Sequence, residues 1–156
     1  MQMWKILLIG IIGGLLILVC NTAVSKIMQY CFHYKIQSER NSIQVKAQKV
    51  TIDLSKLKFL PFFVIWIIIE EFLFRYLLFV CLNRYCNSLL LSMLISSFVF
   101  TLVHTQYKYK MIQVFIMGLI LCGTYIMSDN LISPIISHSI YNFAIIYLLK
   151  DNEKKS

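Results

Sequence analysis

The sequence predicts an all-α, polytopic membrane protein, a helix bundle of about five transmembrane helices. Of its 156 residues, 59% are hydrophobic and only 14% are charged, which is too apolar for a soluble globular domain. The charges are also segregated, because several stretches without Asp, Glu, Lys or Arg approach the ~20 residues that a bilayer-spanning helix needs. These stretches are 6–25, 85–107, 111–128 and 130–149.

The first predicted helix covers about residues 6–25, within an N-terminal unit 1–25. Its apolar run is long for the core of a signal peptide, so we interpret it as a retained transmembrane helix. Gly10 and Gly14 form a GxxxG pattern, which permits close helix contact and favours packing within the chain over a dimer face. The basic stretch 26–58 has mixed periodicity and is expected to be a juxtamembrane connector at the membrane surface.

The second predicted helix, about residues 60–82, begins with Pro61 in its first turn, where a missing N–H costs little. Three further helices are expected, joined by short polar turns. They cover about residues 88–105, 111–128 and 131–149. The four helices form the predicted unit 59–150, which a charged tail follows at 151–156.

The distribution of Lys and Arg predicts a cytoplasmic C-terminus and an N-terminus outside the cell. Seven of these residues lie in the connector, two in the turn 106–110 and three after residue 149, against Lys5 and Arg84 at the other side. The net charge of +8 is therefore explained by orientation and by contact with membrane lipid. We expect no nucleic-acid partner, because no nucleic-acid motif accompanies the basic residues.

The middle of the second helix carries three charged side chains, Glu70, Glu71 and Arg75. Each costs roughly 2.5–3.5 kcal/mol at mid-bilayer, so they must be paired or used. Glu71 and Arg75 are separated by four residues and lie ~40° apart around a helix, whereas Glu70 is ~100° from Glu71. We therefore expect an ion pair of Glu71 with Arg75, and a separate Glu70 that can act as a general base. A structural charge cluster is the alternative.

Two later helices supply further polar groups, His104 in the third and His138 with Asn142 in the fifth. Each alone is typical of an interhelical hydrogen bond. Together with Glu70 they complete a set for hydrolysis, in which Glu70 and His104 activate water while His138 and Asn142 stabilise an oxyanion. An aspartyl dyad and an HExxH motif are absent from the sequence.

Two other uses of the same residues stay open. Glu70, His104 and His138 could ligate a divalent metal such as zinc and leave one position open for water. The same three groups could also form a proton or ion path through the membrane. The residue types alone do not decide between these roles.

The polar residues form three motifs that resemble those of a known family. Residues 70–75 read EExxxR, residues 100–104 read FxxxH, and residues 138–142 read HxxxN. The chain therefore resembles the CPBP family of intramembrane proteases, the CAAX proteases and bacteriocin-processing enzymes, also called the abortive-infection family. The resemblance covers about residues 60–149.

The resemblance implies an intramembrane endopeptidase, described for the family both as a metalloprotease and as a metal-free glutamate enzyme. It implies that Glu70 and His104 activate water, that His138 and Asn142 stabilise the oxyanion, and that Glu71 and Arg75 support them. Implied substrates are peptides or lipidated proteins, namely CAAX-type tails, peptide pheromones or bacteriocin leaders. The alternative function is a non-catalytic bacteriocin-immunity or partner-binding membrane protein.

Two expectations concern the assembly of this site. Family members usually have more helices before the first motif, so a second copy of the chain, in a homo-oligomer, is one source of the missing wall. His104 lies near the end of its charge-free stretch, which requires the third helix to extend to about Lys108 and to tilt. Pro134, one turn before His138, is a candidate kink that would adjust the register of the fifth helix, although a proline that the membrane helix merely tolerates is the commoner interpretation.

Overall fold

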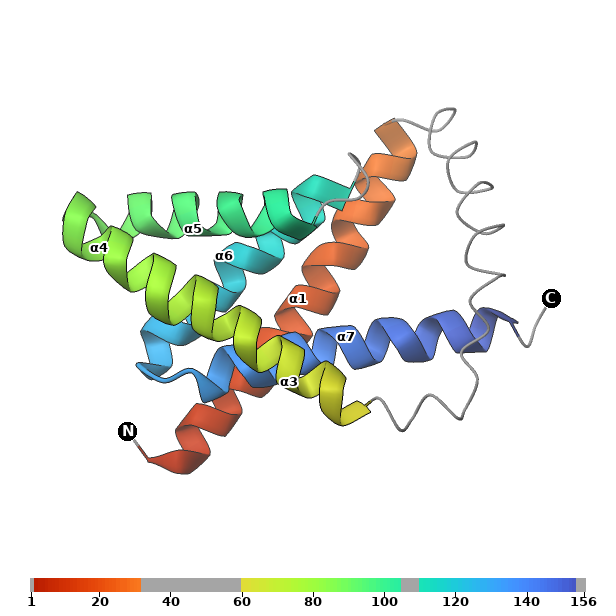
Figure 1. Ribbon diagram of the computed structural model, residues 1–156. Helices are drawn as coiled ribbons and strands as arrows, with labels where there is room; N and C mark the ends of the chain where they lie inside the picture. The colour runs from red at the N-terminus through yellow and green to blue at the C-terminus, as the bar shows by residue number, and fades with distance from the viewer. Residues whose placement is uncertain (1, 32–59, 105–109, 154–156) are drawn as a thin grey trace.

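The computed structural model describes residues 2–31, 60–104 and 110–153, and all secondary structure in these ranges is helical (Figure 1). The predicted all-α class is therefore confirmed. The elements are α1 (Met3–Cys31), α3 (Leu60–Glu71), the π-helix η2 (Phe72–Phe79), α4 (Val80–Cys86), α5 (Leu89–His104), α6 (Met111–Ser128) and α7 (Ile132–Glu153). Because α3, η2 and α4 follow one another without a break, the described residues form five continuous helical stretches, as expected.

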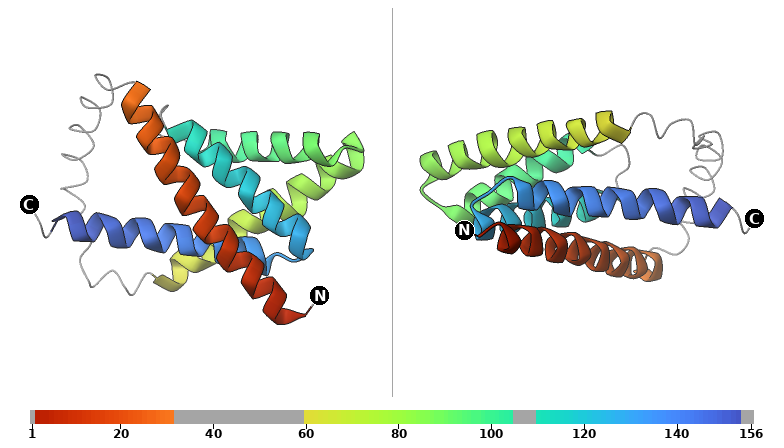
Figure 2. Two further views of the ribbon diagram at one scale, coloured as in Figure 1. Left: turned by 180° about the vertical axis from the view of Figure 1, so that it is seen from behind. Right: turned by 90° about the horizontal axis from the view of Figure 1, so that it is seen from below.

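The helical stretches run back and forth between two ends of the molecule (Figures 1 and 2). The start of α1 and the α4–α5 and α6–α7 turns lie at one end, whereas α5 and α7 finish at the other. Both turns are short because one residue in each, Asn87 with φ 50° and Asp129 with φ 48°, takes the left-handed conformation. Asn and Asp adopt this conformation more readily than most residues, which lets the chain reverse direction within few residues.

The N-terminal helix α1 crosses the bundle and packs against α6 and α7. A side chain at Gly10 would collide with Ile136, and one at Gly14 would collide with Ile140, both on α7. The close approach also brings Ser133 and Ser137 of α7 to α1, where their hydroxyls donate to backbone carbonyls at 2.8 Å. The predicted intramolecular use of the GxxxG pattern is confirmed.

One helix boundary differs from the sequence prediction, and both prolines lie in first turns. The first helix continues beyond residue 25 to Cys31, so the predicted connector starts later; the rest of it, 32–58, lies outside the described residues. Pro61 is the second residue of α3, as predicted. Pro134 is the third residue of α7, in the first turn, where a backbone N–H would have no acceptor within the helix and a proline is easily tolerated.

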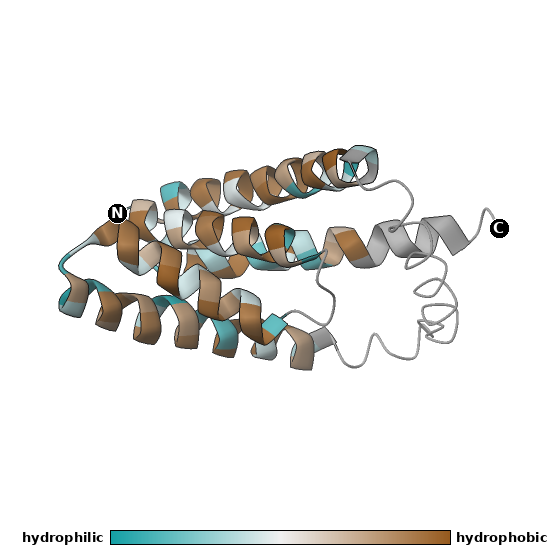
Figure 3. Ribbon diagram, turned by 90° about the horizontal axis from the view of Figure 1, so that it is seen from above, coloured by the Kyte–Doolittle hydropathy of each residue, from teal (hydrophilic) through white to brown (hydrophobic). Residues whose placement is uncertain are grey.

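The molecule is apolar along most of its helices, with polar residues interspersed (Figure 3). Its buried apolar cluster is small and consists of Ile17, Phe100, Met117 and Leu121. Large hydrophobic side chains cover the surfaces of α1, α3, η2 and α5, whereas serines, threonines and charged groups are buried among the helices. This distribution is typical of a bundle that faces lipid, and α1 and α6 are each long and apolar enough to cross a membrane.

The π-helix η2 holds the middle of the second stretch against α5. The buried hydroxyl of Ser96 on α5 donates a 2.9 Å hydrogen bond to the backbone carbonyl of Phe74 within η2. A short π-helix of this kind occurs frequently next to functional sites. Here it begins immediately after Glu71 and contains Arg75, so the α-to-π transition lies within the EExxxR motif.

Candidate active site

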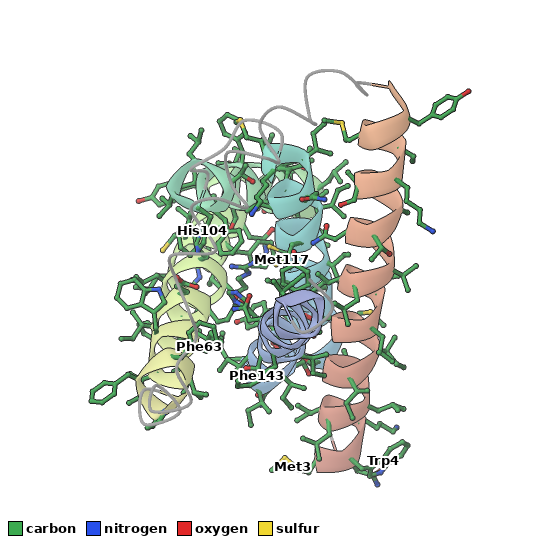
Figure 4. All side chains as sticks on the ribbon, turned by 90° about the vertical axis from the view of Figure 1, so that its right-hand side faces the viewer. Met3, Trp4, Phe63, His104, Met117 and Phe143 are labelled. Atoms are coloured by element: carbon green, nitrogen blue, oxygen red, sulfur yellow. The ribbon has the colours of Figure 1, made fainter. Side chains whose placement is uncertain are left out.

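Five charged or titratable side chains converge from three helical stretches. Glu70 and Glu71 come from the end of α3, and Arg75 comes from η2. His104 is the last residue of α5, and His138 lies in the second turn of α7. Seen from the end at which α7 finishes, His104 lies on the side of the bundle away from α1 (Figure 4).

One half of this cluster is completely buried. The Glu71 side chain is 0% exposed and the Arg75 side chain 1% exposed, and Arg75 Nε lies 3.1 Å from Glu71 Oε2. The other carboxylate oxygen, Oε1, accepts a 2.7 Å hydrogen bond from Nδ1 of His138. The predicted Glu71–Arg75 ion pair is present. The bond to His138 was not predicted, because nothing local in the sequence connects residues that are 67 positions apart.

The other half of the cluster is partly open. Nε2 of His104 lies 3.2 Å from Oε1 of Glu70, and these side chains keep 23% and 13% exposure. Glu70 therefore faces His104 and not Arg75, as the helical geometry predicted. The second carboxylate oxygen, Oε2, lies 4.0 Å from Nε2 of His138, so His138 stands between the two glutamates.

Hydrogen bonding assigns the protons of both imidazoles. Nδ1 of His104 contacts the backbone carbonyl of Phe100 at 2.8 Å, and a carbonyl can only accept, so this nitrogen carries a proton. The other ring nitrogen of His104, Nε2, is the one that faces Oε1 of Glu70. In His138, Nδ1 donates to the carboxylate that Arg75 neutralises, which directs Nε2 toward Glu70.

Phe100 is the apolar centre of the site and is fully buried. Its ring centroid lies 4.1 Å from that of His104 and 6.1 Å from that of His138. The Arg75 guanidinium lies over the same ring at 4.4 Å, within the range of a cation–π interaction. The ring therefore separates the buried pair from the partly open pair and fixes both imidazoles in place.

The comparisons with known proteins place the chain in a family. Residues 53–144 match the family model described as Type II CAAX prenyl endopeptidase Rce1-like. The chain belongs to this family. No curated protein and no solved structure matches the chain. Membership confirms the resemblance to the CPBP proteases and identifies the chain as a CAAX-type intramembrane endopeptidase in general terms.

The matched region of this Rce1-like protein contains all the predicted site residues. The structure brings five of them into one cluster: Glu70, Glu71, Arg75, His104 and His138. Asn142 lies one helical turn beyond His138 on α7 and is half-buried, but no hydrogen bond joins it to these five residues in the described part of the chain. Its role as an oxyanion donor stays a prediction.

The three residues considered as zinc ligands approach one another. His104 Nε2 lies 3.2 Å from Oε1 of Glu70, and His138 Nε2 lies 4.0 Å from Oε2 of the same carboxylate. Within residues 2–31, 60–104 and 110–153, no group of three or more His, Cys, Asp or Glu side chains is placed to hold a metal ion. The reaction proposed below uses only side chains of this protein.

The expected extension of α5 to about Lys108 falls on residues 105–109, which lie outside the described residues. The site is nevertheless assembled with His104 as the last described residue of α5. Figure 1 shows the second stretch and α5 diverging from the α4–α5 turn, and it is η2 and α4 that pack against α5. The Glu70 and His104 side chains meet across the space between the two helices. The angle between two helices cannot be deduced from the depth of a residue along each segment.

Two site features were missing from the sequence prediction. The first is the central position of Phe100, of which the only sequence signal is its place in the FxxxH motif. The second is the position of His138 between the two glutamates, 2.7 Å from Glu71 Oε1 and 4.0 Å from Glu70 Oε2, which depends on how α7 packs against the second helical stretch.

Proposed function

We propose that this Rce1-like protein hydrolyses a peptide bond with water that Glu70 and His104 activate. The observation that carries the proposal is the Glu70–His104 contact of 3.2 Å, which is the partly exposed side of an otherwise buried cluster. A carboxylate paired with an imidazole beside it can accept a proton from water and return it to a leaving group. Membership of a CAAX endopeptidase family supports the same reaction class.

The proposed reaction has two proton transfers. As water attacks the carbonyl carbon of the scissile bond, Glu70 accepts one of its protons and a tetrahedral oxyanion forms. The carbon–nitrogen bond then breaks, and the departing amine receives the proton held by the Glu70–His104 pair. The carbonyl of Phe100 keeps the His104 ring oriented throughout, because it holds Nδ1 as a donor.

His138 is proposed to stabilise the oxyanion from its Nε2 side. Its Nδ1–H is held by the buried Glu71 carboxylate at 2.7 Å, which orients Nε2 toward Glu70; donation to an oxyanion requires a proton on Nε2 as well. Asn142, one turn farther along α7, is proposed as the second donor. A preorganised donor at an oxyanion is worth roughly 10²–10³ in rate.

The proposed substrates are the carboxyl-terminal tails of CAAX-type proteins, peptide pheromones or bacteriocin leaders, presented within the membrane. Support comes from the exposed, apolar and aromatic surface of α3 next to the Glu70–His104 side. We further propose that all five helical stretches span the membrane, with the N-terminus outside and the C-terminus cytoplasmic. The alternation of helix direction between two ends supports this topology (Figure 1).

Cleavage of a quenched peptide library by the purified protein in liposomes tests the proposal. The wild type should cleave, and Glu70→Gln should lower kcat/KM by about 10²–10⁴-fold because the water-activating base is lost. Asp129→Asn, a matched change at the exposed α6–α7 turn, should leave cleavage unchanged. A chelator should have no effect.

Two outcomes would contradict the proposal. Cleavage by Glu70→Gln at the wild-type rate would remove Glu70 from the mechanism. Absence of cleavage from a well-folded wild type, with library members covering all three substrate classes, would instead favour the non-catalytic immunity or partner-binding role.

A further inference from the structure

Ser96 is a buried serine of α5 that lies outside the three motifs. Its side chain is 1% exposed, and its hydroxyl donates a 2.9 Å hydrogen bond to the backbone carbonyl of Phe74 in η2. Serines in helices often donate to a carbonyl of their own helix, as Ser92 does one turn earlier, with the carbonyl of Ser88 at 2.8 Å. The hydroxyl of Ser96 instead connects two helices.

The carbonyl that Ser96 binds belongs to a residue that contacts the site. The Phe74 ring meets the His104 ring edge-on, with centroids 6.1 Å apart, and meets the Phe100 ring edge-on at 5.1 Å. The Phe100 ring in turn lies 4.1 Å from the His104 ring. Two phenyl rings therefore contact the His104 imidazole, and one of them belongs to the residue that Ser96 anchors.

We infer that Ser96 is a positioning residue, which acts through Phe74 to hold the His104 imidazole against Glu70. The inference rests on the proposed function, in which His104 and Glu70 activate water. Ser96 is not a catalytic residue in this account. It bonds to the backbone of Phe74 and contributes to the reaction through that residue.

The position of His104 explains why such an anchor is useful. His104 is the last described residue of α5, and its side chain keeps 23% exposure. The hydrogen bond to the Phe100 carbonyl fixes one nitrogen of the ring, whereas the rest of the ring is held by packing. A displacement of a catalytic group by about 1 Å can lower the rate by about 10²-fold, so this packing matters for activity.

The same hydrogen bond holds the π-helix in place. η2 extends from Phe72 to Phe79, and Phe74 is its third residue. In lipid, every backbone polar group needs a partner within the protein, and a serine of a neighbouring helix is one source. Without the hydroxyl of Ser96, η2 loses its bond to α5 and is free to carry the Phe74 ring away from His104.

An NMR experiment tests the structural step and does not require activity. The chain has three histidines, so isotope-labelled histidine gives few imidazole signals, and His104→Gln identifies those of His104. Phe74→Leu removes the neighbouring ring and should shift the His104 signals through loss of its ring current. Ser96→Ala should shift them in the same direction. Ser92→Ala, a matched loss of a buried hydroxyl that bonds within its own helix, should leave them unchanged.

Kinetics with the library substrate, well below the melting temperatures of all variants, test the effect on the proposed reaction. Ser96→Ala should lower kcat by about tenfold with KM nearly unchanged, as expected for a displacement of His104 by less than about 1 Å. Ser92→Ala is the control and should keep wild-type kcat. Ser96→Ala combined with Phe74→Leu should lower kcat no further than Phe74→Leu alone, because both changes remove the same contact.

Three results would overturn the inference: His104 signals that Ser96→Ala leaves in place, a Ser96→Ala enzyme with wild-type kcat, or additive losses in the double variant. Failure of the proposed function gives a different result, because the wild type then shows no cleavage that depends on Glu70. The NMR comparison still shows in that case whether Ser96 positions the His104 ring, so the two failures can be distinguished.

Discussion

Glu70 and Glu71 are adjacent in the chain and chemically identical, yet the fold places them in opposite surroundings. Glu71 is fully buried between Arg75 and His138, with both oxygens engaged. Glu70 is partly exposed and faces His104. One step of about 100° around a helix is enough to separate a carboxylate that holds the bundle together from one that is available for chemistry.

The difference in burial also predicts different effects for mutations in the two halves of the cluster. The buried half consists of groups whose charges compensate one another, and removal of one partner leaves an uncompensated charge in an apolar bundle. The open half costs less stability to change, because its side chains stay partly exposed. Mutations should therefore divide into those that damage the fold and those that damage only the proposed activity.

The largest effect is expected from Arg75→Met, which leaves the buried Glu71 without its cation. Breaking a buried ion pair in this way costs about 3–5 kcal/mol, so the variant should accumulate poorly in membranes and melt at a lower temperature. Immunoblotting of membrane fractions and thermal unfolding in detergent measure both effects. Arg84→Met, a matched change at an exposed arginine of α4, should be neutral. If Arg75→Met is as stable as the wild type, the buried half of the cluster does not have the structural role assigned to it.

A smaller effect, confined to activity, is expected from Asn142→Ala. Asn142 makes no hydrogen bond to the buried pair in the described residues, so its loss should leave the melting temperature unchanged. Loss of one oxyanion donor should lower kcat by about 10²–10³-fold. Peptide cleavage measures this, with Asn83→Ala on α4 as the control. A fall in stability without a fall in kcat would place Asn142 in the structural half instead.

The smallest effect is expected at the contact between α1 and α7, which supports the helix that carries His138. A side chain at Gly13 would overlap Thr124 and Ser137, so Gly13→Ala should destabilise the bundle by about 1–3 kcal/mol through overpacking. At Gly123 nothing lies within 4 Å of an added side chain, so Gly123→Ala should not destabilise it. Thermal unfolding of the two variants in parallel measures the difference between their melting temperatures. Equal melting temperatures would contradict the close packing of α1.

Much of the fold could be predicted from the sequence, because a charged side chain inside a bilayer is costly. The charge-free stretches therefore indicated where the helices lie. The first helix is longer than predicted because Lys26, the first charged residue after 6–25, lies within it and α1 continues to Cys31. A single lysine near the membrane surface does not end a helix.

The site could be predicted only as far as local geometry determines it. The Glu71–Arg75 pair followed from a spacing of four residues along one helix. The bond from His138 to Glu71 depends on how α7 packs against the second helical stretch, and no local pattern contains that information. The π-helix within the EExxxR motif likewise had no signal in hydrophobic periodicity.

The most direct test of the division between the two glutamates is to measure Glu70→Gln and Glu71→Gln side by side for thermal unfolding and peptide cleavage. Both changes remove one negative charge and keep the side-chain shape. We predict that Glu70→Gln melts like the wild type and loses cleavage, whereas Glu71→Gln melts at a clearly lower temperature because Arg75 loses its partner. Equal melting temperatures for the two variants, or a lower one for Glu70→Gln, would contradict this account.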